Sequence, residues 1–253
     1  MTAHSTHRIT DDEIRTIDAV ELSHWFYCGM RELCASLMAP VLPSRRPLRI
    51  LDVGCGTGGN LLQLAGLGHA EGIDASPLCV EYCRKKGLTC TLGSMSDLSA
   101  VGGRFDVITV FDVLNQAGPA ETIPILGGIH AKLEPGGLIV LREPALRVAG
   151  GAHDRAVGIQ QRFTRSGIRN ALERAGFEAL RITYLNTLLF PPIVLRRRLD
   201  DLLYGPDRAR SDVRPTAPLV NALLLGVLRA EGQLLRVMDL PFGVSVFAAA
   251  RKV

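Results

Sequence analysis

Short apolar runs alternate along the chain with stretches whose apolar residues recur at helical spacing. The runs are bounded by Gly, Pro or acidic residues, which is typical of buried strands. We predict strands at Arg49–Val53, His69–Asp74, Leu88–Leu92, within 104–116, and at Leu138–Leu141, Phe177–Leu185 and Gly243–Ala250. We predict helices between most of them, after the glycines at 54–59 and at Pro77–Lys86, Thr122–Leu133 and Thr164–Ala175. This alternation predicts an α/β fold with a doubly wound sheet.

Two regions lie outside the alternation. Residues 11–42 precede the first strand and contain an aromatic cluster that follows His24, with the one tryptophan of the chain. About fifty residues separate the sixth strand from the last, and Leu219–Val237 has apolar residues at i, i+3, i+4 and i+7. We therefore expect an N-terminal helical cap (1–45), a core (46–185 plus 243–253) and a helical insertion (186–242).

The insertion has several interpretations. The simplest is a lid over an active site, and a lid wall rich in Leu, Val and Phe would favour an apolar substrate. A second is contact with a membrane surface, with Arg196–Arg198 near lipid phosphates. A third is a homodimer interface. The three arginines also fit a solvated basic turn on a packed helix.

A glycine-rich loop, Asp52-Val-Gly-Cys-Gly-Thr-Gly-Gly59, follows the first strand directly. Strand, glycine loop and helix together bring a backbone close to a ligand. The spacing is G-x-G-x-G-G rather than the G-x-G-x-x-G of dinucleotide-binding proteins. Asp52 at the strand end would repel a pyrophosphate, and we expect it to face the crevice and a ligand that carries an ammonium group. An ordinary glycine turn is the alternative.

Asp74 ends the second predicted strand, about 20 residues beyond the loop, where a carboxylate meets a ribose diol in nucleotide-binding folds. The alternative is a helix N-cap, and Ser76 fits that role better. Arg142 and Glu143 end the fifth strand, either facing the ligand crevice or forming a salt bridge with each other.

The glycine loop resembles the first motif of the class I S-adenosylmethionine-dependent methyltransferases. Asp112-Val-Leu-Asn-Gln116 and Leu133-Glu-Pro-Gly-Gly137 stand in the order of that family's later motifs. The His-Trp cap, the Asn-Thr-Leu-Leu-Phe-Pro segment (186–191) and the Asp-Leu-Pro-Phe-Gly ending (239–243) are similar to one bacterial small-molecule branch. The resemblance covers about 20–252. It implies a Rossmann-like, seven-stranded sheet with an antiparallel last strand, and S-adenosylmethionine as cofactor.

The resemblance also implies roles for single residues. Asp52 would face the methionine ammonium, Asp74 would bind the ribose hydroxyls, and the Phe111 carbonyl would accept from the ammonium. Met95 would line the adenine, while Ser94 stands where the family often has an acid, so Asp97 is an alternative contact. The other expected cofactor contacts are Tyr27, Arg31, Gly54, Cys55, Gly56, Gly58, Asn60, Ala75 and Ser94.

The catalytic base is less clearly marked. Gln116 stands where the family commonly has a histidine, and an amide takes no proton at neutral pH. An acceptor that must lose a proton would need another base, for which we name His153, in the 145–163 loop, and His24 as the second choice. The missing histidine also permits other adenosylmethionine chemistry, such as a cyclisation. A non-catalytic partner protein is a further alternative, against which the intact cofactor positions argue. Asp52 and the loop spacing disfavour a nicotinamide dehydrogenase.

Composition and charge limit the partners and the cellular location that we expect. The chain has 253 residues, a net charge of +4 and 47% hydrophobic residues. This mild charge permits an anionic substrate or a membrane surface but does not argue for nucleic acid, for which a clustered basic face is typical, so we expect no nucleic-acid partner. There is no apolar signal segment and no stretch of spanning length. The six cysteines form no C-x-x-C. We expect buried free thiols in a reduced, cytoplasmic protein without a metal, with a Cys79–Cys83 metal or redox pair as the alternative.

Overall fold

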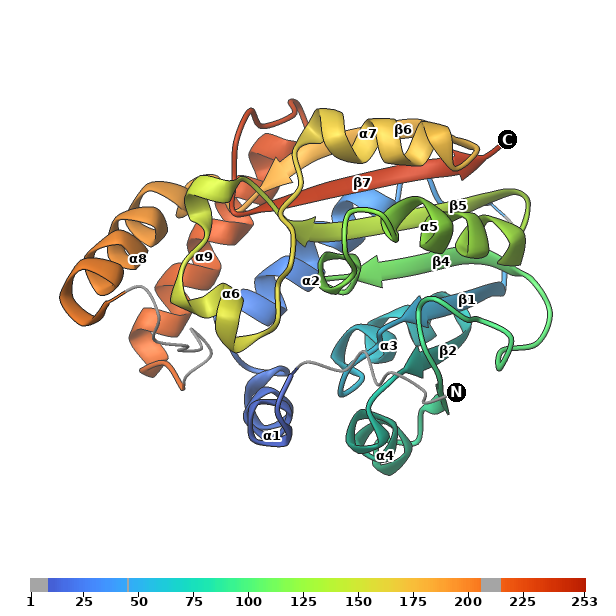
Figure 1. Ribbon diagram of the computed structural model, residues 1–253, viewed down its shortest axis with the longest axis horizontal. Helices are drawn as coiled ribbons and strands as arrows, with labels where there is room; N and C mark the ends of the chain where they lie inside the picture. Colours follow the sequence, from blue (N-terminus) through green and yellow to red (C-terminus); the bar gives the residue numbers. More distant parts are fainter. Residues whose placement is uncertain (1–8, 45, 206–214) are drawn as a thin grey trace.

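The computed structural model describes residues 9–44, 46–205 and 215–253, apart from the side chains of residues 152 and 153. Within them, a seven-stranded sheet has the order β3-β2-β1-β4-β5-β7-β6 (Figure 1). Strand β7 is antiparallel to both of its neighbours, β5 and β6, and the other pairs are parallel. The predicted Rossmann-like sheet with an antiparallel last strand is confirmed. The strands are β1 Leu48–Val53, β2 Gly68–Asp74, β3 Thr89–Leu92, β4 Phe105–Phe111, β5 Leu133–Pro144, β6 Phe177–Leu185 and β7 Ser245–Lys252.

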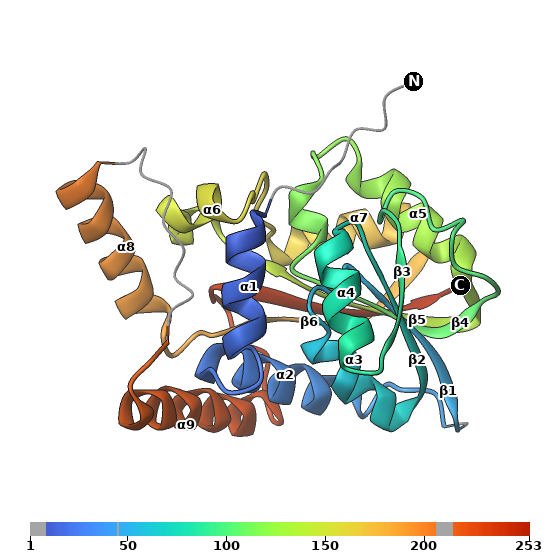
Figure 2. The same ribbon diagram turned by 90° about the horizontal axis from the view of Figure 1, so that it is seen from below.

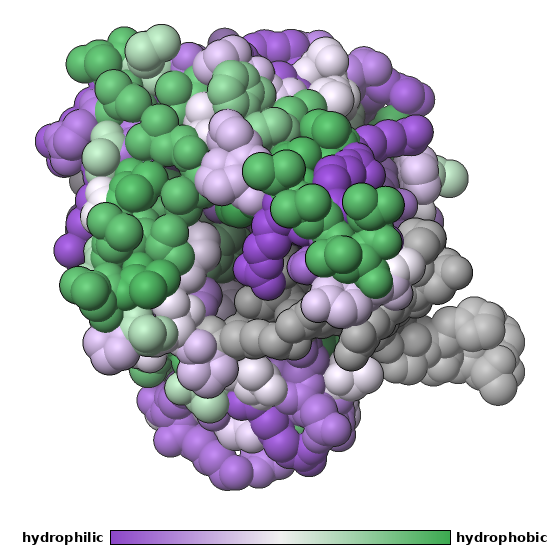
Figure 3. Space-filling model, turned by 90° about the vertical axis from the view of Figure 1, so that its left-hand side faces the viewer, coloured by the Kyte–Doolittle hydropathy of each residue, from purple (hydrophilic) through white to green (hydrophobic). Residues whose placement is uncertain are grey.

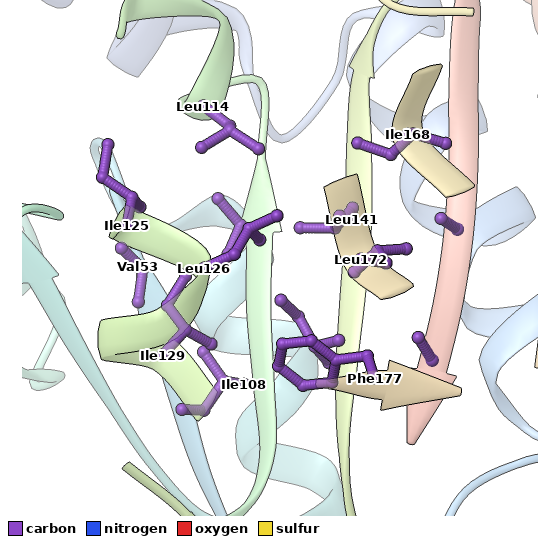
Figure 4. Packing of buried hydrophobic residues seen from close by; sticks show 14 of the residues in the cluster. Val53, Ile108, Leu114, Ile125, Leu126, Ile129, Leu141, Ile168, Leu172 and Phe177 are labelled. Atoms are coloured by element: carbon purple, nitrogen blue, oxygen red, sulfur yellow. The ribbon is translucent and has the colours of Figure 1, made fainter. Parts of the chain in front are cut away.

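Helices cover both faces of the sheet (Figure 2). Side chains of α5 and α7 pack on one face, where Leu126, Ile129, Ile168 and Leu172 are buried (Figure 4). Helices α2, α3 and α9 pack on the other face. The α-helices are α1 Asp11–Val20, α2 Trp25–Met38, α3 Gly59–Leu64, α4 Pro77–Lys85, α5 Thr122–Lys132, α6 Ala152–Ala156, α7 Arg165–Arg174, α8 Phe190–Tyr204 and α9 Pro218–Leu235.

Helix starts follow the predicted capping residues. Ser76 Oγ accepts from the Cys79 N–H (3.3 Å) and caps α4. Thr164 Oγ1 accepts from the Gly167 N–H (3.1 Å) and caps α7. These side chains satisfy N–H groups that have no partner inside the helix.

Two segments differ from the prediction. Residues 133–137 lie before the predicted strand Leu138–Leu141, but they belong to β5. The β4–β5 pairing steps from Phe105↔Leu133 to Val107↔Leu138, so the intervening residues of β5 form a bulge. The predicted 145–163 loop contains a 3₁₀ turn at Arg147–Ala149 and the short helix α6.

The insertion contains α8 and α9, and α9 lies against α2 of the N-terminal region (Figure 2). A Cβ added to Gly29 would lie 2.4 Å from Leu228 Cδ1, so the missing side chain permits this close approach. Asn221 Oδ1 also accepts from the Trp25 N–H (2.7 Å). Helix α8, by contrast, has no buried residue. None of the helices in the described residues is long and apolar enough to cross a membrane.

Candidate active site

A cavity of about 540 Å³ lies beyond the carboxyl ends of β1, β2, β4 and β5. The glycine loop forms one side of it, and residues of α2, α8 and α9 form the other. Most of the residues expected to contact the cofactor line this cavity. They are Tyr27, Arg31, Gly54, Cys55, Gly56, Asn60, Asp74, Ala75, Met95 and Phe111.

The glycine loop has left-handed backbone where the sequence has glycine. Gly54 has φ +70°, and a Cβ there would lie 2.2 Å from Val113 Cγ2. Gly56 has φ +56°, and a Cβ there would meet nothing within 4 Å. Gly54 therefore lets two loops touch, whereas Gly56 leaves open space on the cavity side.

Asp74 joins the glycine loop to α4. Its Oδ2 accepts from the Gly56 N–H (2.9 Å), and its Oδ1 accepts from the Ser76 N–H (2.8 Å). Asp74 remains half-buried in the cavity wall, with Ser76 as the helix cap. The carboxylate thus fixes the loop and still lies where a ligand can contact it.

Glu21 occupies the N-terminus of α3, and sequence reasoning missed it. Its Oε2 accepts from the Gly59 N–H (3.1 Å), and its Oε1 accepts from Lys86 Nζ (2.6 Å). Arg31 donates to the Glu21 carbonyl (2.7 Å). A carboxylate of the protein therefore takes the helix N-terminus that holds pyrophosphate in dinucleotide-binding proteins. Glu21 lies 38 residues before Gly59, outside any local motif.

Asp52 does not face the crevice, which corrects the prediction. It is 1% exposed on β1, where it pairs in register with Thr109, and its Oδ1 accepts from Thr109 Oγ1 (2.6 Å). Among the described residues its Oδ2 has no hydrogen-bond partner. Burial raises the pKa of Asp52 to about 7. The carboxyl group lies in the sheet beneath the loop.

Gly58 and Ser94 also lie outside the cavity wall. Gly58 packs against α4 and the residue that precedes β3, since a Cβ there would lie 3.1 Å from Cys83 Sγ and 2.8 Å from Leu88 Cδ1. Ser94 Oγ bonds to Ser96 Oγ (2.8 Å) in a local turn. Met95 is the residue of this turn that reaches the cavity.

Arg142 is paired with Asp112. The Nε and Nη2 atoms of Arg142 both donate to Asp112 Oδ2. The Arg142 guanidinium also lies over the Phe111 ring, 5.1 Å from its centroid. Asp112 has φ +59°, a strained value for a residue other than glycine. The ion pair lies in the cavity wall, and it replaces the alternative Arg142–Glu143 bridge.

Glu143 points away from the cavity, into the loop after β4. It is fully buried and accepts from the Leu114 N–H (2.9 Å), the Asn115 N–H (3.0 Å) and Asn115 Nδ2 (2.9 Å). Burial raises the pKa of Glu143 to about 8. Its role is to hold the loop that places Asn115 and Gln116 in the cavity wall.

The two predicted histidines have different outcomes. His24 lines the cavity and caps α2, because its Nδ1 accepts from the Phe26 N–H (3.4 Å) while its Nε2 lies 3.0 Å from Thr216 Oγ1. The side chain of His153 lies outside the described residues. Its neighbour Asp154 accepts from Arg162 Nε (2.7 Å) and Nη2 (2.6 Å), and Arg162 reaches the cavity.

Three buried thiols meet beneath the glycine loop. Cys55 Sγ lies 3.3 Å from Cys90 Sγ and 3.8 Å from Cys83 Sγ. The six cysteines are free in this structure. Cys79, which we had considered as the partner of Cys83, is not part of this group, because the sulfur atoms that converge come from the loop, α4 and β3.

Comparisons with known proteins show the family to which the chain is similar. The family model described as a methyltransferase domain matches residues 28–182. An uncharacterized methyltransferase of Synechocystis is 29% identical over 146 residues, which are 53% of this chain and 68% of that protein. A ubiquinone biosynthesis O-methyltransferase of Cereibacter sphaeroides is 36% identical over 100 residues, 37% of this chain and 40% of that protein.

Solved structures share the fold at low sequence identity. A putative sarcosine dimethylglycine methyltransferase from Galdieria sulphuraria has a TM-score of 0.59 at 17% identity, covering 89% of this chain and 86% of that one. The cyclase SpnF has a TM-score of 0.55 at 21% identity, covering 88% and 79%. The family model matches more than half of the chain, and the seven-stranded sheet has the antiparallel last strand that the resemblance implies. The protein therefore belongs to the class I S-adenosylmethionine-dependent methyltransferases.

Proposed function

We propose that this methyltransferase binds S-adenosylmethionine on the glycine-loop side of the cavity and transfers the methyl group to an apolar or amphipathic small molecule. The observation that carries the proposal is the composition of the cavity beyond the carboxyl ends of the strands. The wall contains Gly56 and Asp74 and also the apolar side chains of Trp25, Phe26 and Leu224. The polar part suits a nucleoside, and the apolar part suits an acceptor with little charge.

The cavity residues have assignable roles toward the cofactor. Asp74 is the partner for the ribose hydroxyls, and Met95 is the apolar contact for the adenine. The open space at Gly56 receives the methionyl part. Arg31 lies beside the start of α3, with its Nη1 3.1 Å from where a Cβ of Gly59 would be, and it suits the methionine carboxylate. Asp52 acts indirectly, by holding Thr109 beneath the loop.

The protein contributes alignment and exclusion of water. Bound S-adenosylmethionine supplies an electrophilic methyl group on a sulfonium. The chain holds the two reactants in line at roughly 3–3.5 Å, which can supply about 7–11 kcal/mol of the barrier. Tyr27 and Trp25 of the cap line the cavity, and we propose that they close it above the glycine loop. We propose that the insertion (186–242) acts as the lid, together with the cap (1–45), over the core (46–185 plus 243–253).

Proton removal is needed only for an acceptor such as a hydroxyl. The Nδ1 of His24 accepts from a backbone N–H, so the remaining ring nitrogen carries the proton of the neutral form and faces Thr216. His24 therefore has little capacity as a base in this arrangement, and we propose that it positions the cap. His153 stays a prediction.

The test of the proposed function has two steps. Calorimetry should show that one S-adenosylhomocysteine binds per chain. Incubation with methyl-labelled S-adenosylmethionine and a cell extract should then transfer label to products that partition into organic solvent. Absence of binding would overturn the cofactor assignment, and label confined to the aqueous phase would overturn the acceptor class.

The second candidate function is another adenosylmethionine reaction, such as a cyclisation. Gln116, which replaces the family's usual histidine, lies in the cavity wall and favours it. Mass spectrometry separates the two, because methyl transfer adds one methyl group to the product whereas the alternative releases methylthioadenosine or leaves the acceptor's mass unchanged.

The free thiols support the proposed cytoplasmic location.

A further inference from the structure

Helix α8 presents an apolar face that the described part of the chain leaves exposed. Leu195, Leu199, Leu202 and Leu203 follow at i, i+4, i+7 and i+8, so they lie on one side of the helix. Leu202 is 81% exposed and Leu203 is 69% exposed. Leucines on the apolar side of an amphipathic helix normally pack on a core, so this exposure indicates contact with something outside the chain.

The start of α9 extends this surface. Leu219 is 83% exposed and Leu223 is 67% exposed, one turn apart on the helix. Figure 3 shows the two apolar areas on this side of the molecule, with a hollow between them. We call the exposed leucines of the two helices the α8–α9 apolar face; they are Leu195, Leu199, Leu202, Leu203, Leu219 and Leu223.

The apolar face borders the active-site cavity. Ile193 and Arg197 of α8 line the cavity, as do Val220 and Leu224 of α9. Each helix therefore has one side toward the cavity and another toward solvent. A molecule that enters between the helices would pass from the apolar face directly to the apolar wall of the cavity.

Positive charge accompanies the apolar face. Arg147 and Arg155, in the segment that packs against α8, are exposed. Arg197 and Arg198 donate to the carbonyls of Ala149 and Val148. A carbonyl fixes the direction of a guanidinium but leaves its charge in place. Arg196 is offset by Asp200, at 3.8 Å.

We propose that the α8–α9 apolar face docks on an anionic lipid bilayer, and that the methyl acceptor is an amphipathic lipid that enters the cavity between the two helices. Leucines beside arginines fit the boundary between acyl chains and phosphate headgroups. A protein partner on this face would cover the entrance to the cavity, whereas a bilayer would deliver an apolar acceptor through it. The proposed docking is argued only from the exposed residues of the two helices. The identity of the acceptor rests on the proposed function.

Vesicle flotation tests the docking with the full chain. We expect the protein to float with vesicles of phosphatidylcholine and phosphatidylglycerol and to float less with pure phosphatidylcholine. Salt at about 1 M, where the screening length is about 3 Å, should reduce the difference between the two vesicles. The Leu202→Glu/Leu203→Glu variant should lose more than about tenfold in vesicle affinity.

A matched control replaces two exposed apolar residues far from the insertion. Leu92 on β3 is 51% exposed and the C-terminal Val253 is 87% exposed, so Leu92→Glu/Val253→Glu adds the same charge elsewhere. We expect this control to float like the wild type. Docking is overturned if the wild type floats with neither vesicle, if both double variants lose affinity equally, or if light scattering shows a dimer that Leu202→Glu/Leu203→Glu splits without any flotation.

A second measurement separates this proposal from the proposed function. Binding of S-adenosylhomocysteine without flotation would leave the methyltransferase assignment in place and remove the docking. Flotation without binding of S-adenosylhomocysteine would leave the docking in place and remove the methyltransferase assignment. When both occur, labelled methyl groups should appear in the lipid fraction of vesicles made from cell lipids, and Leu202→Glu/Leu203→Glu should slow that transfer while cofactor affinity stays unchanged. Label only in water-soluble products would overturn the lipid acceptor.

Discussion

The two sides of the cavity are built in different ways. On the glycine-loop side, Asp74 at a strand end bonds to Gly56 and Ser76, which are its near neighbours in the sheet and the chain. On the insertion side, the buried Glu231 of α9 accepts from the backbone N–H groups of Asn186 (2.5 Å) and Thr187 (2.7 Å). Glu231 lies 45 residues from Asn186, and α8, which follows this turn, has no buried residue.

The two sides of the cavity therefore suit different ligands. On the glycine-loop side, Asp74 bonds to near neighbours, and the long-range contact of Glu21 with Gly59 fixes the start of α3. This side is therefore suited to one constant ligand. The insertion side is attached mainly through α9, because α8 has no buried residue and packs on the 147–156 segment outside the core. Such a side can differ among related enzymes without loss of the sheet, which fits an acceptor site.

The first prediction tests the attachment of the insertion. Leu228 is fully buried between α9 and Gly29 of α2, so Leu228→Ala should lower the free energy of unfolding by about 2–5 kcal/mol in urea titrations. Leu223→Ala, on the exposed side of α9, should change it by less than about 0.5 kcal/mol. Equal effects of the two would show that α9 is not held by this contact.

The second prediction tests the glycine-loop side. Asp74→Ala removes the hydrogen bonds to Gly56 and Ser76 as well as the proposed ribose partner. It should weaken S-adenosylhomocysteine binding by about 100-fold, or about 2.7 kcal/mol, in calorimetry. Glu71→Ala, on the same strand but outside the cavity wall, should bind as the wild type does. Unchanged affinity in Asp74→Ala would sink the ribose assignment.

The third prediction concerns the buried Asp52. Burial raises its pKa from 3.8 to about 7, so the folded state holds a proton that the unfolded state releases. Its contribution to stability is therefore present below pH 3.8 and is lost as the pH rises toward 7, with a slope of at most about 1.4 kcal/mol per pH unit. Urea unfolding across this range should show a shallower fall for Asp52→Asn. An identical pH dependence of the unfolding free energy in the wild type and Asp52→Asn would contradict a raised pKa of Asp52.

The smallest effect on the free energy of unfolding is expected from the ion pair at the exposed edge of the α2–α9 contact. Arg229 forms a two-point ion pair with Glu32, with both N–O distances 2.8 Å, but the two side chains are 59% and 44% exposed. Arg229→Ala should lower the free energy of unfolding by less than about 1 kcal/mol, and less again in high salt. A loss comparable to that of Leu228→Ala would mean that charge, rather than apolar packing, attaches the insertion.

Sequence patterns predicted what depends on neighbours in the chain. The strand ends, the cap at Ser76 and the place of Asp74 in the cavity wall follow from local motifs. The contacts of Glu21 and Glu231 could not be predicted, because each carboxylate bonds to backbone groups about forty residues away and no residue type marks such a partner. Asp52 was misplaced for a related reason. Its motif fixes its position on the strand, while the direction of its side chain depends on Thr109 of the next strand in the sheet.

The apolar face shows the same limit. Helical spacing predicted an amphipathic segment at the insertion, and a lid, a membrane contact and a dimer interface all fitted it. The choice among them requires knowledge of which leucines the core covers. Leu228 and Leu235 are buried against the core, whereas Leu202 and Leu203 are not. Only the packing of α9 on α2 separates the two sets.

A crystal structure with S-adenosylhomocysteine tests the central claim most directly. We expect the ribose hydroxyls at Asp74, the adenine against Met95, and the sulfur facing the part of the cavity bounded by Ile193, Val220 and Leu224. A nucleoside bound away from Asp74, or a sulfur enclosed on its open side by charged residues with no passage to α8 and α9, would contradict it.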